Sequence, residues 1–281
     1  DQCGSRGLGD VYKRQGIATS IGHSPISGLI DPVAGSRNSI AEALTNIIWA
    51  PIKDNIRGIS LSANWMWPCK NKGEDARLFK AVEAVSEFTI DLGINIPTGK
   101  DSLSMNQKYK DQEVKSPGTV IISATGHCEN INFVVEPVFK KNYGSIYYIN
   151  LSNDKFKLGG SSFSQIMGNV GLETPSIQNP EFFKKTFNVV QDLIKNELII
   201  AGHDIGSGGL ITSLLEMCFP SINISANIDL SALNEKDSVK LLFSENCGLI
   251  VQSKSEEIEK IFTQFSVEYY KIGEVISGDS M

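Results

Sequence analysis

Residues 201–210 read AGHDIGSGGL, and this stretch decides how the chain is expected to fold. An apolar segment ends at His203 and Asp204, a loop of glycine and serine follows, and an apolar helix pattern begins after the loop. A junction of strand, glycine loop and helix exposes backbone N–H groups where a phosphate can bind. Gly206 and Ser207 are therefore candidates for nucleotide contacts, and Asp204 for a metal ion that bridges the phosphates. A tight turn with Asp204 as a helix cap is the alternative, because the stretch matches neither the P-loop nor the dinucleotide-binding pattern.

Helix-like and strand-like segments alternate on both sides of this junction. The periodicity predicts helices over residues 39–49, 74–92, 181–196, 209–219 and 255–265. It predicts strands over residues 57–63, 119–125, 145–151, 198–201, 239–243, 248–252 and 268–272. This alternation indicates a mixed α/β or α+β class. A polar, turn-rich stretch near Lys141 suggests a boundary between units 16–140 and 141–281.

The first fifteen residues, DQCGSRGLGDVYKRQ, differ from the rest of the chain. They show no apolar periodicity and are rich in glycine, arginine and aspartate. Residues 1–15 are interpreted as a leader that is non-native or disordered, with a native flexible lead-in as the alternative. In either case the chain is expected to begin in the middle of a longer protein.

Composition excludes several classes of function. Hydrophobic residues make up 41% and charged residues 21%, a globular balance that argues against disorder. The formal net charge of -6 gives no support to nucleic-acid binding, which usually leaves a basic footprint. No apolar run approaches the roughly 20 residues of a membrane span, so no membrane contact is expected. Five scattered cysteines without a CxxC pair indicate reduced thiols and a cytoplasmic protein.

The segment AEALTN, residues 41–46, carries a candidate metal site. Glu42 and Asn46 stand four positions apart on an expected helix, so their side chains share one face. A carboxylate and an amide oxygen suit Mg²⁺, which takes oxygen ligands and keeps several waters. A solvated pair on an amphipathic helix is the alternative.

Two further segments carry candidate phosphate contacts. PTGKDSLSM, residues 97–105, offers the cation of Lys100 on an expected glycine turn, unless Lys100 only forms a local contact with Asp101. LGGSSFSQ, residues 158–165, places paired glycines before hydroxyls and either cradles phosphate or caps a helix. No nucleophile elbow or Cys–His glutaminase signature appears, so no catalytic nucleophile is indicated.

Taken together and in this order, these motifs resemble the synthetase region of the phosphoribosylformylglycinamidine synthase family in its long, single-chain form. The blocks that carry the resemblance span residues 16–281 and read GIATSIGHSP, DPVAGSRNSIAEALTN, LSANWMWPCKNKGEDARL, GINIPTGKDSLSM, SPGTVIISATG, LGGSSFSQ, AGHDIGSGGLITSLLEMCF and YKIGEVISG. The resemblance implies a fold similar to aminoimidazole ribonucleotide synthetase, with an N-terminal half that builds a shared barrel and a C-terminal α/β half. This chain looks like the second of the two copies that the family contains.

The resemblance also implies a reaction and its ligands. The family is a carbon–nitrogen ligase that converts formylglycinamide ribonucleotide, ATP and glutamine to formylglycinamidine ribonucleotide, ADP, phosphate and glutamate. ATP or ADP and Mg²⁺ are thus the expected cofactors, and Glu42, Asn46 and Asp204 match the family's magnesium ligands. Gly206 stands where the family usually has a serine that contacts nucleotide, which leaves a backbone contact at that position.

The implied partners are the substrate ribonucleotide and the rest of the same polypeptide, namely the first synthetase half and the glutaminase domain. The isolated fragment is therefore expected to be inactive with glutamine. Two alternatives remain at this point: a non-catalytic, nucleotide-loaded structural module, or another synthetase of the same superfamily.

Overall fold

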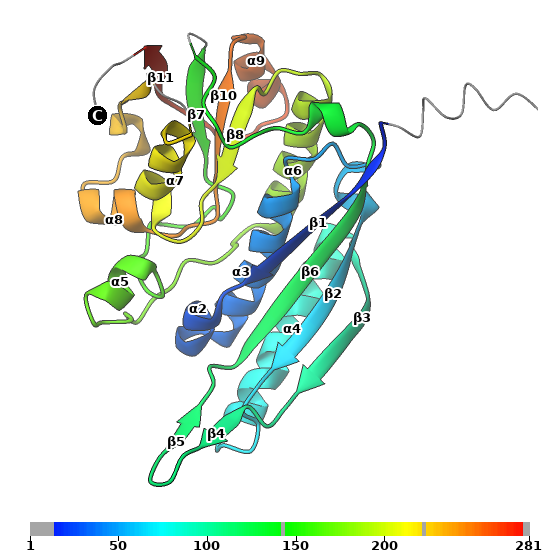
Figure 1. Cartoon of the computed structure of the whole chain (residues 1–281), viewed down its shortest axis with the longest axis vertical. Helices are drawn as coiled ribbons and strands as arrows, with labels where there is room; N and C mark the ends of the chain where they lie inside the picture. The colour runs from blue at the N-terminus through cyan, green and yellow to red at the C-terminus, as the bar shows by residue number, and fades with distance from the viewer. Residues whose placement is uncertain (1–13, 142–143, 221–222, 278–281) are drawn as a thin grey trace, which may run out of the picture.

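The computed structural model of the chain describes residues 14–141, 144–220 and 223–277. Almost all of the expected leader, residues 1–15, falls outside these ranges, so its interpretation stays a prediction. Two sheets with helices packed on them make up most of the described chain (Figure 1). The first sheet ends in sequence with β6 and the second begins with β7, on either side of the expected boundary near Lys141.

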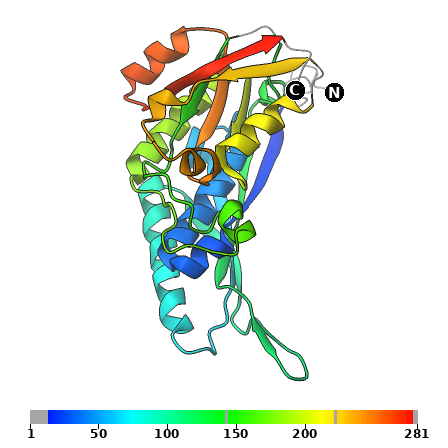
Figure 2. The same cartoon turned by 90° about the vertical axis from the view of Figure 1, so that its left-hand side faces the viewer.

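The first sheet has four strands in the order β1-β6-β2-β3. Its strands are β1 (Gly16–His23), β2 (Ile59–Met66), β3 (Asn95–Ser102) and β6 (Thr119–Cys128). β1 and β2 both pair antiparallel with β6, while the edge strand β3 runs parallel to β2. One face of the sheet packs on α2 (Pro25–Ile30), α3 (Pro32–Ile47) and α4 (Glu74–Leu92) (Figure 1). A small hairpin, β4 (Asn106–Lys108) and β5 (Glu113–Lys115), projects from the far end of this sheet (Figure 2).

The second sheet has five antiparallel strands in the order β8-β10-β7-β11-β9. They are β7 (Ser145–Ile149), β8 (Ala201–Asp204), β9 (Ile224–Ile228), β10 (Leu249–Ser253) and β11 (Tyr270–Ser277). The helices of this region are α5 (Ser162–Ile166), α6 (Pro180–Lys195), α7 (Gly209–Cys218), α8 (Ser238–Phe243) and α9 (Glu257–Gln264).

The inner strands β7 and β10 of the second sheet are buried on both faces, which explains their runs of apolar residues. Successive side chains of a strand point to opposite faces. Tyr147 and Ile149 accordingly join the core that contains α6 and α9, whereas Ile146 and Tyr148 join a second core with α7. A strand buried on both sides loses the alternation of apolar and polar residues and reads as a run such as SIYYI.

The larger core is continuous between the two regions of the chain. It contains residues of α3, α4, β2 and β6 together with residues of α6, α9 and β10. Phe88 of α4 and Phe183 of α6 meet edge to face, with ring centroids 5.9 Å apart. The helix α6 therefore couples the second sheet to the helices of the first.

Several expected elements differ from the structure; the strand expected at residues 198–201, for example, lies at Ala201–Asp204. Residues 238–243 form helix α8 rather than a strand, because the carboxylate of Asp237 caps the helix by accepting from Val239 N at 3.0 Å. Helix α3 begins at Pro32, seven residues before the expected start, because Asp31 caps it there. The expected glycine turn at residues 97–105 is wrong, since β3 continues through Ser102. Among the described residues, the structure contains no helix with the length and apolar character to cross a membrane.

Candidate nucleotide and metal site

A cavity of about 370 Å³ opens where the two sheets' helices and loops meet. Its lining comes from segments far apart in the chain: residues 23–27, Asn38, Glu42 and Thr45, residues 159–162, Gln165, Pro175, residues 205–207, Glu245 and Cys247. Three of the motifs singled out in the sequence thus border one cavity, namely AEALTN, LGGSSFSQ and AGHDIGSGGL.

Glu42 reaches the cavity from α3 because β1 packs closely on that helix. A Cβ added to Gly22 would lie 2.2 Å from Ser39 O, so only glycine permits this approach. The backbone N–H of His23 then donates to the Glu42 carboxylate at 2.9 Å. Burial raises the pKa of Glu42 above its ordinary value of 4.5, and the negative charges of Asp204 and Glu245 add to the shift. An ionised Glu42 is therefore under electrostatic stress that a bound cation would relieve.

Asp204 lies at the end of β8, where the chain turns toward the cavity. Asp204 is 9% exposed, and its backbone carbonyl accepts a hydrogen bond from Ser213 Oγ at 2.9 Å. Burial raises the pKa of the Cys247 thiol, and the charges of Asp204 and Glu42 raise it further. Glu42 and Asp204 therefore act on the same buried thiol from different elements.

The loop after β8 has the form expected of a strand, glycine loop and helix. Asp204 does not cap α7, whose N-cap is Gly208, so the capping alternative is not what the structure shows. Gly208 and Gly209 have positive φ values of 91° and 75°, which favour glycine. In the part of the chain that the structure describes, the backbone N–H groups of Gly206 and Ser207 have no protein acceptor. Two donors beside the cavity are thus available for a ligand.

The glycine loop 159–162 also borders the cavity. Gly160 has φ +82°, and a Cβ there would lie 2.8 Å from Ser27 Oγ, so the loop passes close to α2. The Ser161 side chain accepts from Ser164 N at 3.2 Å, so the expected serine cap of a helix is confirmed.

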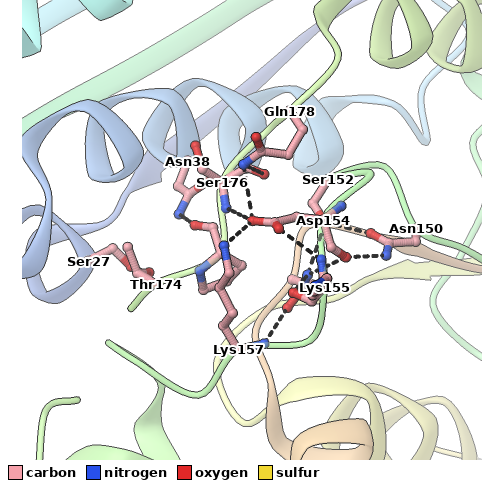
Figure 3. Close-up of polar contacts among 12 residues, drawn as sticks. Ser27, Asn38, Asn150, Ser152, Asp154, Lys155, Lys157, Thr174, Ser176 and Gln178 are labelled. Atoms are coloured by element: carbon pink, nitrogen blue, oxygen red, sulfur yellow. Dashed lines mark hydrogen bonds and ion pairs between the residues drawn. The ribbon is translucent and has the colours of Figure 1, made fainter. Parts of the chain in front are cut away.

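A network of polar side chains and backbone groups surrounds Asp154, close in sequence to loop 159–162 (Figure 3). The Asp154 carboxylate accepts from Lys157 Nζ at 2.7 Å, and from Ser176 N and Gln178 Nε2 at 3.1 Å each. The segment that contains Ser176 is held against the helices of the first sheet, because Thr174 Oγ1 donates to Ser27 Oγ at 2.8 Å. Figure 3 shows the donors of Lys157, Ser176 and Gln178 directed at the Asp154 carboxylate.

Asn46 and Lys100, the remaining candidates, lie in different surroundings. Asn46 is exposed on α3, one turn beyond Glu42, and its Nδ2 donates to Ile21 O at 3.1 Å. Lys100 lies exposed on the edge strand β3, where its Nζ contacts Asp101 O and Ser102 Oγ. Of the candidate residues, Glu42, Gly206 and Ser207 line the cavity, whereas Asn46, Lys100 and Asp204 do not, and the ligand contacts of all of them stay predictions.

Sequence reasoning missed Glu245, which lines the cavity and bonds to both glycine loops. The available signal was the polar triplet of residues 244–246, which stands two residues before the buried strand β10. Such a triplet does not reveal its partners, because they lie far away in the sequence.

Comparison with known proteins places the chain in a family. Residues 7–127 match the FGAR-AT PurM_N-like domain, and residues 149–281 match the C-terminal domain of AIR synthase related proteins. A probable phosphoribosylformylglycinamidine synthase of Caenorhabditis elegans is 40% identical over 272 residues, which cover 92% of this chain and 20% of that protein.

Solved structures support the same fold. Thermotoga maritima PurL complexed with FGAR has a TM-score of 0.74 at 16% identity, covering 94% of this chain and 42% of that chain. The same protein complexed with ATP has a TM-score of 0.70 at 14% identity, covering 94% and 41%. The expected fold similar to aminoimidazole ribonucleotide synthetase is thereby confirmed. The chain belongs to the phosphoribosylformylglycinamidine synthase family and spans about a fifth of the length of the curated relative described above.

Proposed function

We propose that this chain is a nucleotide-binding part of an ATP-dependent amidoligase of purine biosynthesis. The whole enzyme would convert formylglycinamide ribonucleotide, ATP and glutamine to formylglycinamidine ribonucleotide, ADP, phosphate and glutamate. The convergence of Glu42, Gly206 and Ser207 on one cavity, with Asp204 close behind, carries this proposal. The structures of Thermotoga maritima PurL complexed with FGAR and with ATP support the proposed substrate and nucleotide.

Charge explains why the nucleotide would arrive with a divalent cation. Three carboxylates lie in or near the cavity, those of Glu42, Asp204 and Glu245. Without a cation, they would repel the phosphates of a nucleotide. Among the described residues, no three His, Cys, Asp or Glu side chains are arranged to hold a metal by themselves. Mg²⁺ suits such a place, because it keeps waters and relies on substrate phosphates for part of its coordination.

The chemistry assigns a role to each candidate residue. Glu42, Asp204 and the amide of Asn46 would supply oxygen ligands to Mg²⁺, which neutralises phosphate charge when it is bound. The N–H groups of Gly206 and Ser207 would donate to the phosphates. Because phosphoryl transfer asks a protein for positioning and charge neutralisation, no covalent nucleophile is required.

Because this chain spans only about a fifth of its relative, it would be one part of a longer enzyme. Residues 16–140 and 141–281 would form the N-terminal and C-terminal halves of the second synthetase-like copy. The first synthetase half and the glutaminase domain would be supplied by the rest of the polypeptide in the cytoplasm. The chain by itself would bind nucleotide without glutamine-dependent turnover.

Calorimetric titration of the chain with ADP and Mg²⁺ tests the site. Glu42→Gln and Asp204→Asn keep shape and remove charge, and each is expected to weaken binding at least about tenfold, or about 1.4 kcal/mol. Glu83→Gln on the exposed face of α4 and Asp111→Asn at the hairpin tip are the matched controls. Unchanged affinity in both site variants would contradict the proposed ligands.

The same variants in the complete enzyme separate a catalytic site from a structural one. If the nucleotide only stabilises the fold, their effect appears as a lower melting temperature, because a ligand bound only to the native state stabilises it by mass action. If the nucleotide reacts, turnover falls while the melting temperature changes little.

A further inference from the structure

Glu245 connects the two glycine loops that border the cavity. Its Oε1 accepts from the backbone N–H of Ser162 and from that of Gly208, both at 2.8 Å. Ser162 is the first residue of α5, and Gly208 is the N-cap of α7. Glu245 itself lies in the segment between α8 and β10. One carboxylate oxygen thus joins three segments that are remote in sequence.

The bonds to Glu245 are of a strong kind. A hydrogen bond from a backbone N–H to an ionised carboxylate is roughly twice as strong as one between neutral groups. At Gly208 the carboxylate also faces the N-terminal end of α7, where the helix dipole favours negative charge. The other hydrogen bonds of loop 159–162 are mostly local, such as Ser161 N to Leu158 O at 3.0 Å. Glu245 therefore links the two loops directly.

We propose that Glu245 is a positioning residue that holds loops 159–162 and 206–208 at the spacing needed to bind phosphate between them. The phosphate ligand in this inference rests on the proposed nucleotide function, whereas the two hydrogen bonds of Glu245 do not depend on it. The residue acts through its acceptor oxygen on backbone donors, and so it orders the loops without coordinating the metal. A glutamate that served as a metal ligand would instead depend on its charge.

Two substitutions at position 245 separate these roles. Glu245→Gln retains an acceptor oxygen and removes the charge, whereas Glu245→Ala removes both. In Glu245→Ala, the Ser162 and Gly208 amides are expected to exchange hydrogen at least about tenfold faster, while amides of β7 and β10 stay protected. Mg²⁺–ADP affinity is expected to fall at least about tenfold in Glu245→Ala and to stay within about threefold in Glu245→Gln. Glu256→Ala, at an exposed position before α9, is the control.

A third variant removes one donor and leaves the carboxylate in place. Ser162 is the first helical residue after the N-cap, a position that tolerates proline because its N–H has no partner within the helix. Ser161 has φ -69° and ψ 158°, which suits a residue before proline. Ser162→Pro removes one of the two hydrogen bonds of Glu245, so it is expected to lower the melting temperature slightly, to speed exchange within residues 163–167 and to weaken Mg²⁺–ADP binding.

The outcomes distinguish the two proposals. Unaltered exchange at Gly208 in Glu245→Ala would overturn the positioning role, and so would equal losses of affinity in Glu245→Gln and Glu245→Ala. If the unaltered chain binds no Mg²⁺–ADP, the proposed function fails, while the exchange measurements still decide whether Glu245 holds the loops. If Glu245→Ala does not fold, Glu245→Gln and Ser162→Pro carry the same decision.

Discussion

The backbone N–H of His23 donates a 2.9 Å hydrogen bond to the carboxylate of Glu42, which ties the end of β1 to the middle of α3. This bond favours the ionised carboxylate, yet burial outweighs it and raises the pKa of Glu42. The ionised side chain is thus held in place at a cost in stability. Such an arrangement is typical of a group whose charge serves a ligand rather than the fold.

A first prediction concerns the stability of the chain without metal. A carboxyl whose pKa is higher in the folded than in the unfolded state contributes stability that is present below the unfolded pKa and is lost as pH rises through the folded pKa. Without Mg²⁺, Glu42→Gln is therefore expected to raise the free energy of unfolding at pH 7, and the gain should shrink as pH falls toward the ordinary value of 4.5. Urea denaturation in a chelator measures this. Saturating Mg²⁺–ADP should make the unaltered chain the more stable of the two proteins. A lower free energy of unfolding for Glu42→Gln at pH 7 without metal would contradict the argument.

A second prediction uses the open space at Gly206. A Cβ there would meet no atom within 4 Å, and the residue does not have a positive φ. Gly206→Ser is therefore expected to leave the melting temperature unchanged and to place a hydroxyl beside the cavity, which strengthens Mg²⁺–ADP binding by up to about 1 kcal/mol. Gly208→Ser is the matched contrast, because Gly208 has φ +91° and a Cβ would lie 2.3 Å from Thr212 Oγ1. Gly208→Ser should lose more than about 1 kcal/mol of stability. Equal thermal behaviour of the two variants would refute this reading of the loop.

The parts of the site that local pattern determines were predictable from the sequence. Glu42 and Asn46 share a face of α3 because helix periodicity places them there, and residues 201–210 form the expected strand, loop and helix. β1 was not predicted, because Ile17 and Ile21 are exposed while the small residues between them face α3. A half-buried strand normally buries its apolar side chains, whereas β1 exposes Ile17 and Ile21. The buried face of β1 could therefore not be deduced from its apolar residues.

The remaining features depend on contacts between distant residues. Glu245 bonds to Ser162 and Gly208 across 83 and 37 positions, and no local pattern encodes such pairs. The placement of Lys100 likewise depends on the pairing of β3 with β2, which puts Lys100 opposite Asn64 on the sheet edge. Local chemistry identified the cation of Lys100 but wrongly predicted a turn around it, because the pairing of β3 with β2 places Lys100 within a strand.

A third prediction tests the connection between the two regions through Gln191. This side chain of α6 is fully buried; its Oε1 accepts from Ile52 N at 2.7 Å, and its Nε2 donates to Ala50 O at 3.0 Å. Gln191→Leu keeps the size but leaves buried backbone groups unpaired, at about 1–3 kcal/mol for each group. Urea denaturation should show a loss of at least about 2 kcal/mol. Gln264→Leu at the exposed end of α9 is the control, with a change within about 0.5 kcal/mol.

A fourth prediction concerns Asp154 and Lys157 in the network behind loop 159–162. The Asp154 side chain is 9% exposed and that of Lys157 is 26% exposed. Asp154→Ala removes the acceptor shared by Lys157, Ser176 N and Gln178 Nε2, so it is expected to lose about 2–3 kcal/mol of stability. Lys157→Met should lose less, since the remaining carboxylate keeps its three other donors, namely Lys155 N, Ser176 N and Gln178 Nε2.

The double variant decides whether the pair acts as a unit. In Asp154→Ala the ammonium of Lys157 is left half-buried without its partner, and Lys157→Met removes that unpaired charge. The double variant is therefore expected to be more stable than the sum of the single losses predicts, with a coupling of about 1 kcal/mol. Additive losses would mean that Asp154 acts through its neutral donors, Lys155 N, Ser176 N and Gln178 Nε2, and not through Lys157. In that case the segment that meets Ser27 would be anchored by neutral donors, and its stability would be insensitive to salt.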